Sequence, residues 1–166
     1  MISACEFCSI VENNIARKKA EEERIRRERE RLIVEKKKNT LSFCENILAS
    51  SFDKQIDKHL TKKSVFLPNL FIIDKEDNDS FVNVVNIERK DVAIGKTKFG
   101  NTLYTRKVTL SSEIYSISVV KDYFKERGYK VNLYPKDIIT HWSDATKKIR
   151  WLSGTKIEIS IDCDLA

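Results

Sequence analysis

The sequence predicts an α+β fold, in which a long charged N-terminal helix and short helices precede a mostly antiparallel sheet with one packed helix. Glycine and proline are absent from residues 1–67, and the lack of both helix breakers over so long a run favours helix. From Val65 onward, short runs of β-branched and aromatic residues alternate with turn signals, which is typical of strands. We therefore expect three parts: a helical arm at 1–39, amphipathic connecting helices at 40–64 and an α+β domain at 65–166.

The charge of the chain is concentrated in one segment. The 166 residues are 41% hydrophobic, enough for a packed core, and 34% charged, which exceeds the usual quarter. Residues 17–38 contain eleven Lys and Arg against six Glu, so their net charge of +5 (11 − 6) accounts for most of the whole-chain +6. The basic character therefore belongs to the arm, and the rest of the protein is close to neutral.

The arm should be stabilised mainly by its own side chains. Its start has two candidates with the spacing of a capping box, Ser3 with Glu6 and Ser9 with Glu12. Charged pairs four residues apart then support the helix. These pairs are Glu22–Arg26, Glu23–Arg27, Arg24–Glu28, Arg26–Glu30 and Arg31–Glu35.

A long coiled coil is not expected in the arm. Val11, Lys18, Ile25 and Leu32 share one heptad position, but polar residues occupy the matching second position, so there is no continuous apolar seam. A short contact through the apolar side chains of the arm is the simpler expectation.

The helix is predicted to break at Asn39–Thr40 and to be followed by a second helix. The second helix would bury one apolar face, with further apolar residues repeating at intervals of four. That face comprises Leu41, Cys44, Ile47 and Leu48, and the later repeat comprises Phe52, Ile56 and Leu60.

The first strands should form a hairpin. Residues 65–73 and 80–87 flank a polar loop, Asp74–Asp79, and are predicted to pair antiparallel. Residues 101–110 read as one further strand, and residues 95–100 (GKTKFG) as an exposed basic loop before it.

A compact helix and two more strand regions complete the prediction. Ser111 or Ser112 should cap the helix, Gly128 should end it, and its apolar face should contain Ile114, Ile117, Val120 and Phe124. Residues 129–134 then form a strand, and Pro135 opens a short helix that ends near Trp142. The last segment is predicted to be a hairpin around a three-residue loop, Ser153–Thr155.

No constellation in the sequence indicates catalysis, a cofactor or a resident metal. Cys5 and Cys8 have the spacing of half a zinc site, without a second such pair. The consecutive residues from His141 to Asp144 include the residue types of a triad, but neighbours on one segment point in different directions. Gly95–Lys96–Thr97 lacks the earlier glycine of a phosphate-binding loop, and the acidic loop lacks the glycine and glutamate of an EF-hand. We therefore expect a protein that is not an enzyme.

Membrane and redox signals are also weak. No run approaches eighteen apolar residues, so no membrane span is expected. The four cysteines show no regular framework, which is typical of reduced thiols and predicts a cytoplasmic protein.

Two functions fit these observations. The first is binding to a protein partner, or self-association, through the arm and an aromatic anchor in the domain: Arg24, Ile25, Arg27, Arg31, Leu32 and Trp142. The alternative is binding of nucleic-acid phosphates through the basic arm and basic residues of the domain: Lys96, Lys98, Lys147, Lys148 and Arg150. Glutamates interleaved with every basic cluster of the arm would repel phosphates, which favours the protein partner.

The Lys-, Asn- and Ile-rich composition and the helix-to-strand join FKERGYKV resemble those of small phage-encoded accessory proteins. This resemblance implies a virion component or a factor that binds a host protein.

Overall fold

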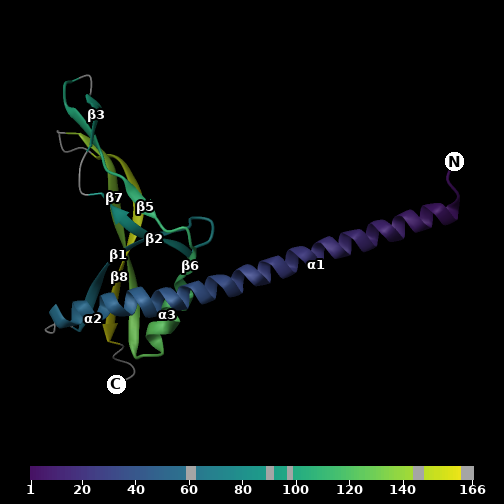
Figure 1. Ribbon diagram of the computed structural model, residues 1–166, viewed down its shortest axis with the longest axis horizontal. Helices are drawn as coiled ribbons and strands as arrows, with labels where there is room; N and C mark the ends of the chain where they lie inside the picture. The colour runs from purple at the N-terminus through teal and green to yellow at the C-terminus, as the bar shows by residue number, and fades with distance from the viewer. Residues whose placement is uncertain (59–62, 89–91, 97–98, 144–147, 162–166) are drawn as a thin grey trace. The chain divides into compact units, whose positions relative to one another are not determined.

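The computed structural model describes residues 1–58, 63–88, 92–96, 99–143 and 148–161. Contacts divide the chain into two compact units, Met1–Lys36 (the N-terminal unit) and Lys37–Ala166 (the C-terminal unit). The elements are helical up to Lys58, and a largely antiparallel sheet with one further helix follows (Figure 1). The predicted α+β class is confirmed.

The first helix, α1 (Ala4–Phe43), begins at the earlier of the two predicted capping boxes. The Ser3 N–H donates to Glu6 Oε2 at 2.7 Å, and the Glu6 N–H donates to Ser3 Oγ at 3.2 Å. These reciprocal bonds satisfy amides that a helix start leaves without partners. The hydrogen bond to the Ser3 backbone also lowers the pKa of Glu6.

The predicted break at Asn39–Thr40 is wrong, because α1 continues through it to Phe43. Thr40 is fully buried, and its Oγ1 accepts a hydrogen bond of 2.8 Å from the Ser116 N–H. Phe43 stacks on Tyr115 with 4.4 Å between ring centroids. Tertiary packing therefore overrides the weak helix propensity of these residues.

The connecting region continues as a π-helix, η1 (Cys44–Leu48), and then as α2 (Ala49–Lys58). Cys44 and Leu48 are buried, as predicted, but Leu41 and Ile47 are exposed. The buried face is shifted toward Thr40 and Phe43, which are buried in the core of the C-terminal unit. Phe52 is buried and Ile56 packs against the same core, whereas Leu60 lies outside the described residues.

The sheet has the strand order β3-β4-β7-β8-β1-β2-β5, and β6 pairs with β2 beside this path. The predicted hairpin is confirmed, since β1 and β2 pair antiparallel through Phe71–Asn83 and Ile73–Phe81. The strands are β1 (Ser64–Ile73), β2 (Ser80–Ile87), β3 (Val92–Lys96), β4 (Thr102–Thr105), β5 (Val108–Leu110), β6 (Tyr115–Ser116), β7 (Tyr129–Ser143) and β8 (Lys148–Ile161).

The segment predicted as one strand, 101–110, is two strands, β4 and β5, that pair with different strands of this sheet. β4 pairs with β7, and the Arg106 N–H donates to the Thr140 carbonyl at 2.9 Å. β5 pairs with β2, and the Glu88 N–H donates to the Lys107 carbonyl at 2.9 Å. β4 and β5 are therefore consecutive in the chain but are not neighbours in the strand order of the described sheet. The sequence does not show this change of partner strand, because both strands lie in one short segment. The expected loop at 95–100 is partly strand, since β3 extends to Lys96.

The helix α3 (Ile117–Lys125) begins later than predicted, because Tyr115 and Ser116 form a strand first. The cap comes from the β1–β2 loop rather than from a local serine. Asp79 Oδ1 accepts from the Ser118 N–H at 2.8 Å, and the Asp79 carbonyl accepts from the Ile117 N–H at 2.7 Å. Ile114 is therefore outside the helix and exposed, while the rest of the predicted face is buried.

The predicted helix after Pro135 is wrong, since β7 continues unbroken from Tyr129 to Ser143. Pro135 pairs with Thr155 of β8. The other neighbour of β7, β4, pairs only with His141–Ser143. The missing N–H of Pro135 therefore removes no hydrogen bond between β7 and β4.

The predicted hairpin around Ser153–Thr155 is also wrong, because these residues lie inside β8, which pairs along its length with β7. Gly154 is needed here for close packing rather than for a turn. A Cβ atom at this position would lie 2.5 Å from the Lys136 carbonyl oxygen.

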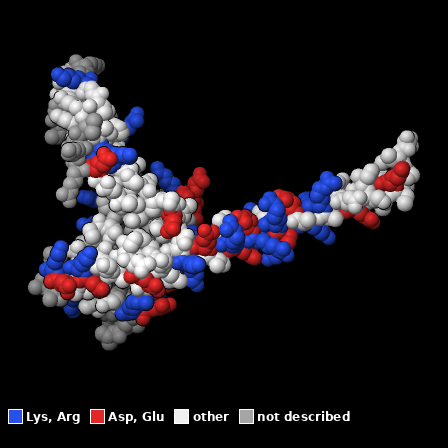
Figure 2. Space-filling model, viewed as in Figure 1, with Lys and Arg blue, Asp and Glu red and all other residues white. Residues whose placement is uncertain are grey.

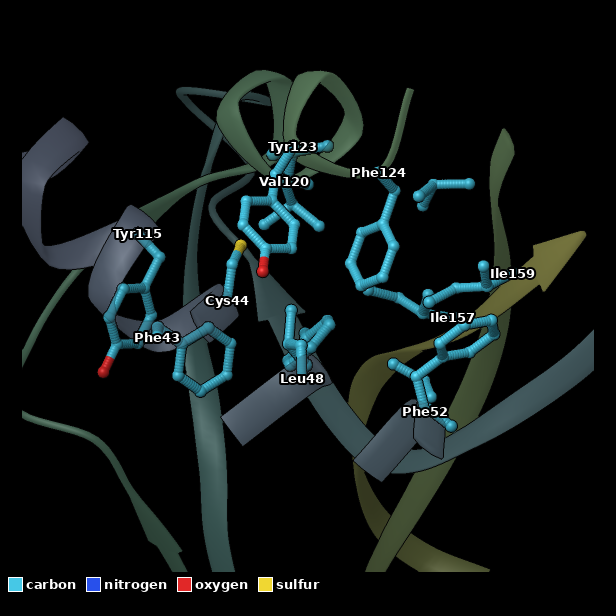
Figure 3. Close-up of a cluster of buried hydrophobic side chains, with 14 of the residues drawn as sticks. Phe43, Cys44, Leu48, Phe52, Tyr115, Val120, Tyr123, Phe124, Ile157 and Ile159 are labelled. Atoms are coloured by element: carbon cyan, nitrogen blue, oxygen red, sulfur yellow. The ribbon is translucent and has the colours of Figure 1, made fainter. Parts of the chain in front are cut away.

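The core of the C-terminal unit lies where the last turn of α1, with η1, α2 and α3, packs against the sheet. Figure 3 shows Cys44 near Val120 and Tyr123 of α3, and Phe43 beside Tyr115. Burial raises the pKa of the Cys44 thiol to about 12, so this thiol is held in its neutral form.

Candidate protein-docking surface

The N-terminal unit is a helical segment with no buried side chain anywhere in its fully described range, Met1–Lys36. Lys, Arg and Glu alternate along its basic segment, as Figure 2 shows. The faces of this unit therefore differ in the pattern of their charged and apolar side chains.

The arginines and glutamates form two ion-pair tracks along the helix. The first track contains Glu21–Arg24 and Glu28–Arg31, each at 2.7 Å, and Arg31–Glu35 at 3.4 Å. Hydrogen bonds donated by Arg24 and Arg31 lower the pKa values of Glu21 and Glu28.

The second track is centred on Glu23 and Arg26. Glu23 pairs with both Arg26 and Arg27, and Arg26 reaches Glu30 at 2.8 Å. The hydrogen bond from Arg26 lowers the pKa of Glu23. Several of the pairs are three residues apart, a spacing that the sequence argument did not use.

A third face of the helix lies between the tracks. With 3.6 residues per turn, side chains at intervals of three, four and seven line up on one face. Six of the side chains that line up here, which we name the helix stripe, are Phe7, Val11, Lys18, Ile25, Arg29 and Leu32, and the polar Asn14 and Lys36 lie on the same face.

The helix stripe combines exposed apolar side chains with cations that lack an ion-pair partner. Phe7 is 60% exposed and Leu32 is 51% exposed. Neither Lys18 nor Arg29 forms a salt bridge within the described residues, whereas the four arginines of the tracks all do. The residues three and four positions from Arg29 are Ile25, Arg26, Leu32 and Ile33, so no carboxylate is within reach along the helix.

The residues predicted as partner-binding therefore divide into two sets. Ile25 and Leu32 belong to the helix stripe, whereas Arg24, Arg27 and Arg31 lie on the tracks and are paired with glutamate. Phe7, Val11, Lys18 and Arg29 were not predicted to accompany Ile25 and Leu32. The heptad spacing of Val11, Lys18, Ile25 and Leu32 was the available signal, but it was tested only as a coiled-coil seam.

The predicted anchor Trp142 lies on β7 in the C-terminal unit. Its ring stacks on Tyr104 with 5.9 Å between centroids, and the Arg106 guanidinium lies 5.0 Å from the Trp142 ring centre. The neighbouring His141 bonds to threonine hydroxyls, at 3.3 Å for Thr105 and 2.9 Å for Thr140.

The described residues of the nucleic-acid alternative lie on β3 and β8, the strands beside β4 and β7, which carry Tyr104 and Trp142. Lys96 on β3 and Arg150 on β8 are both exposed. Lys98 and Lys147 lie outside the described residues, as does the side chain of Lys148.

The cysteine pair predicted as half a zinc site is exposed near the start of α1, with both thiols free. Within the part of the chain that the structure describes, no three His, Cys, Asp or Glu side chains gather as a metal site. Among the same residues, no helix has the length and apolar character needed to cross a bilayer.

Comparison with known proteins gives no relative on which to base a function: no family model, no curated protein and no solved structure matches this chain.

Proposed function

We propose that this chain is a non-enzymatic interaction protein that docks on a protein partner through the helix stripe. The observation that carries the proposal is the separation of self-paired charges from a face of exposed apolar side chains. The arginines of the tracks offer a partner a locally balanced surface, because each lies beside a glutamate of opposite charge. Apolar side chains such as Phe7 and Leu32 gain free energy when a partner removes them from water.

The chemistry of the helix stripe specifies the partner surface. An amphipathic helix binds by laying its apolar face in a hydrophobic groove, with anchors spaced at three, four and seven residues. Lys18 and Arg29 interrupt the apolar anchors, so the groove that fits this helix carries carboxylates beside its apolar floor. The partner is accordingly a protein with an acidic-rimmed apolar groove.

The proposal is tested by two matched double variants in quantitative pull-downs from the native cell. Ile25→Asp with Leu32→Asp places two carboxylates on the helix stripe. Ala20→Asp with Val34→Asp places the same charges on the opposite face, where Val34 is 68% exposed. We expect the first variant to lose at least ten-fold of the captured partner and the second to retain it. Equal capture by both variants would remove the helix stripe from the interaction.

Nucleic-acid binding remains the second candidate because the C-terminal unit offers an aromatic pair among basic residues. Tyr104 and Trp142 stack beside Arg106, and exposed Lys96 and Arg150 lie on neighbouring strands. Aromatic faces and cations together are the usual platform for single strands. Retention on single-stranded DNA or RNA that falls steeply between low and moderate salt would support this candidate.

A further inference from the structure

The C-terminal unit contains a groove of about 470 Å³ at the point where β8 separates from β1. The two strands pair from Ser64–Ser160 to Phe71–Thr155. Past this last pair, Ile72 and Ile73 continue in a ladder with β2 alone, while Leu152–Gly154 continue in a ladder with β7 alone. Among the described strands, nothing pairs with the two strand edges that face the gap.

Apolar side chains and strand backbone form the walls of this groove. Ile72 and Ile73 contribute from β1, Trp151 and Leu152 from β8, and Pro135 from β7. Gly154 adds no side chain, and its close approach to the Lys136 carbonyl fixes β8 against β7. The groove thus offers apolar contacts together with two lengths of strand edge.

One rim of the groove is acidic. The loop Asp74–Asp79 contains four carboxylates and one lysine, a net charge of −3 (1 − 4), and its residues Asp74, Lys75 and Asn78 line the groove. The Asp74 carboxylate accepts the Glu76 N–H at 2.9 Å, and neither Asp74 nor Glu76 forms an ion pair among the described residues. Both carboxylates are exposed; Asp74 lines the groove, and Glu76 follows two residues later in the same loop.

We propose that an extended peptide segment of a partner protein adds as a β-strand in this groove, between β1 and β8. Exposed strand edges are templates for a further strand, and a peptide bound in this way gains affinity from main-chain hydrogen bonds and specificity from alternate side chains. The segment carries apolar residues at alternate positions and a Lys or Arg that reaches Asp74 and Glu76. This proposal rests on the parting of β1 and β8 and is independent of the helix stripe.

The probe is a phage-displayed library of linear twelve-residue peptides selected on the full-length protein, with affinities of the recovered peptides measured by fluorescence anisotropy. We expect recovered peptides to alternate apolar residues and to contain a basic residue. N-methylation at every second position should weaken binding at least ten-fold, and N-methylation at the intervening positions should change it less than two-fold. Recovery of no peptide, or of peptides insensitive to N-methylation, would overturn the proposal.

Two pairs of variants test whether the peptide binds in the groove. Trp151→Ala, in the groove wall, should weaken binding at least five-fold, whereas Ile139→Ala, its exposed cross-strand neighbour outside the groove, should not. Glu76→Gln should weaken binding of basic peptides, and Glu88→Gln, an exposed carboxylate after β2, should leave it unchanged. All four side chains are exposed, so the variants should fold. Equal effects within either pair would contradict the assignment.

Discussion

The Ser116 N–H donates a 2.8 Å hydrogen bond to Thr40 Oγ1 across 76 residues of sequence. This bond ties the last turn of α1 to the start of α3, and both residues are buried. This bond helps to explain why α1 continues through Asn39–Thr40. It also joins the predicted connecting region, 40–64, to the predicted α+β domain, 65–166.

Thr40→Val should destabilise the protein by about 1–3 kcal/mol, because it removes the acceptor and leaves a buried N–H without a partner. Thr40→Ser, which keeps the hydroxyl, should cost less. Urea unfolding followed by circular dichroism measures both. Equal stability of the valine variant and the wild type would mean that the bond contributes nothing.

Gly154→Ala should destabilise the C-terminal unit, because the added Cβ would lie 2.5 Å from a backbone oxygen that cannot rotate away. Overpacking of this kind typically costs about 1–3 kcal/mol. The exposed neighbour provides the control, since Ser153→Ala should leave the melting temperature nearly unchanged. A stable Gly154→Ala variant would show that β7 and β8 are not held this closely.

Phe124→Ala should cost about 3–5 kcal/mol, because the side chain is 2% exposed and packs edge-on against Phe52. Ile114→Ala should change stability by less than about 0.5 kcal/mol, since the side chain is exposed outside α3. Denaturant midpoints compare the two. If both variants lost similar amounts of unfolding free energy, Ile114 would belong to the buried helix face, as the sequence periodicity predicts.

Acid should weaken the helix of the N-terminal unit. The pKa values of Glu21, Glu23 and Glu28 are lowered in the folded helix, mainly by hydrogen bonds from arginine. A carboxylate with a lowered folded pKa stabilises the helix above its unfolded pKa of about 4.5, and this stabilisation is lost as the pH falls through the lower, folded value.

Circular dichroism at 222 nm should therefore be constant above pH 5 and fall below pH 4. The triple variant Glu21→Gln, Glu23→Gln and Glu28→Gln should show a smaller fall, because it lacks these titrating groups. An identical acid transition in both proteins would refute the ion-pair account.

Thiol reactivity should differ sharply along the chain. Cys5 and Cys8 are exposed, whereas Cys44 is buried with a pKa of about 12. Iodoacetamide at pH 8, followed by peptide mass mapping, should label Cys5 and Cys8 and leave Cys44 unmodified until the protein is unfolded. Labelling of all three at similar rates would show that the core around Cys44 opens readily.

The elements that sequence reasoning predicts correctly depend on local signals. The long helix follows from the absence of Gly and Pro before Pro68, and the β1–β2 hairpin follows from two apolar runs around a charged loop. Gly128 ends the α3 region as predicted, with a positive φ that glycine adopts without strain. In each case the deciding residues are close in sequence.

The errors arise where a distant partner decides the local structure. Asp79 provides the cap of α3 from another loop, so no serine near the helix predicts its start. Pro135 and Gly154 look like a helix start and a turn, but long pairing between β7 and β8 gives both a place in a strand. The helix stripe was only partly predicted because charge counting does not show which arginines are already paired.

The most direct test of the account is photo-crosslinking from the two faces of the N-terminal unit in the native cell, with benzoylphenylalanine placed at Leu32 or at Val34. Both positions are exposed and two residues apart, but only Leu32 belongs to the helix stripe. The account predicts a protein adduct from position 32 and none from position 34. Equal adducts from both positions, or adducts to nucleic acid alone, would contradict it.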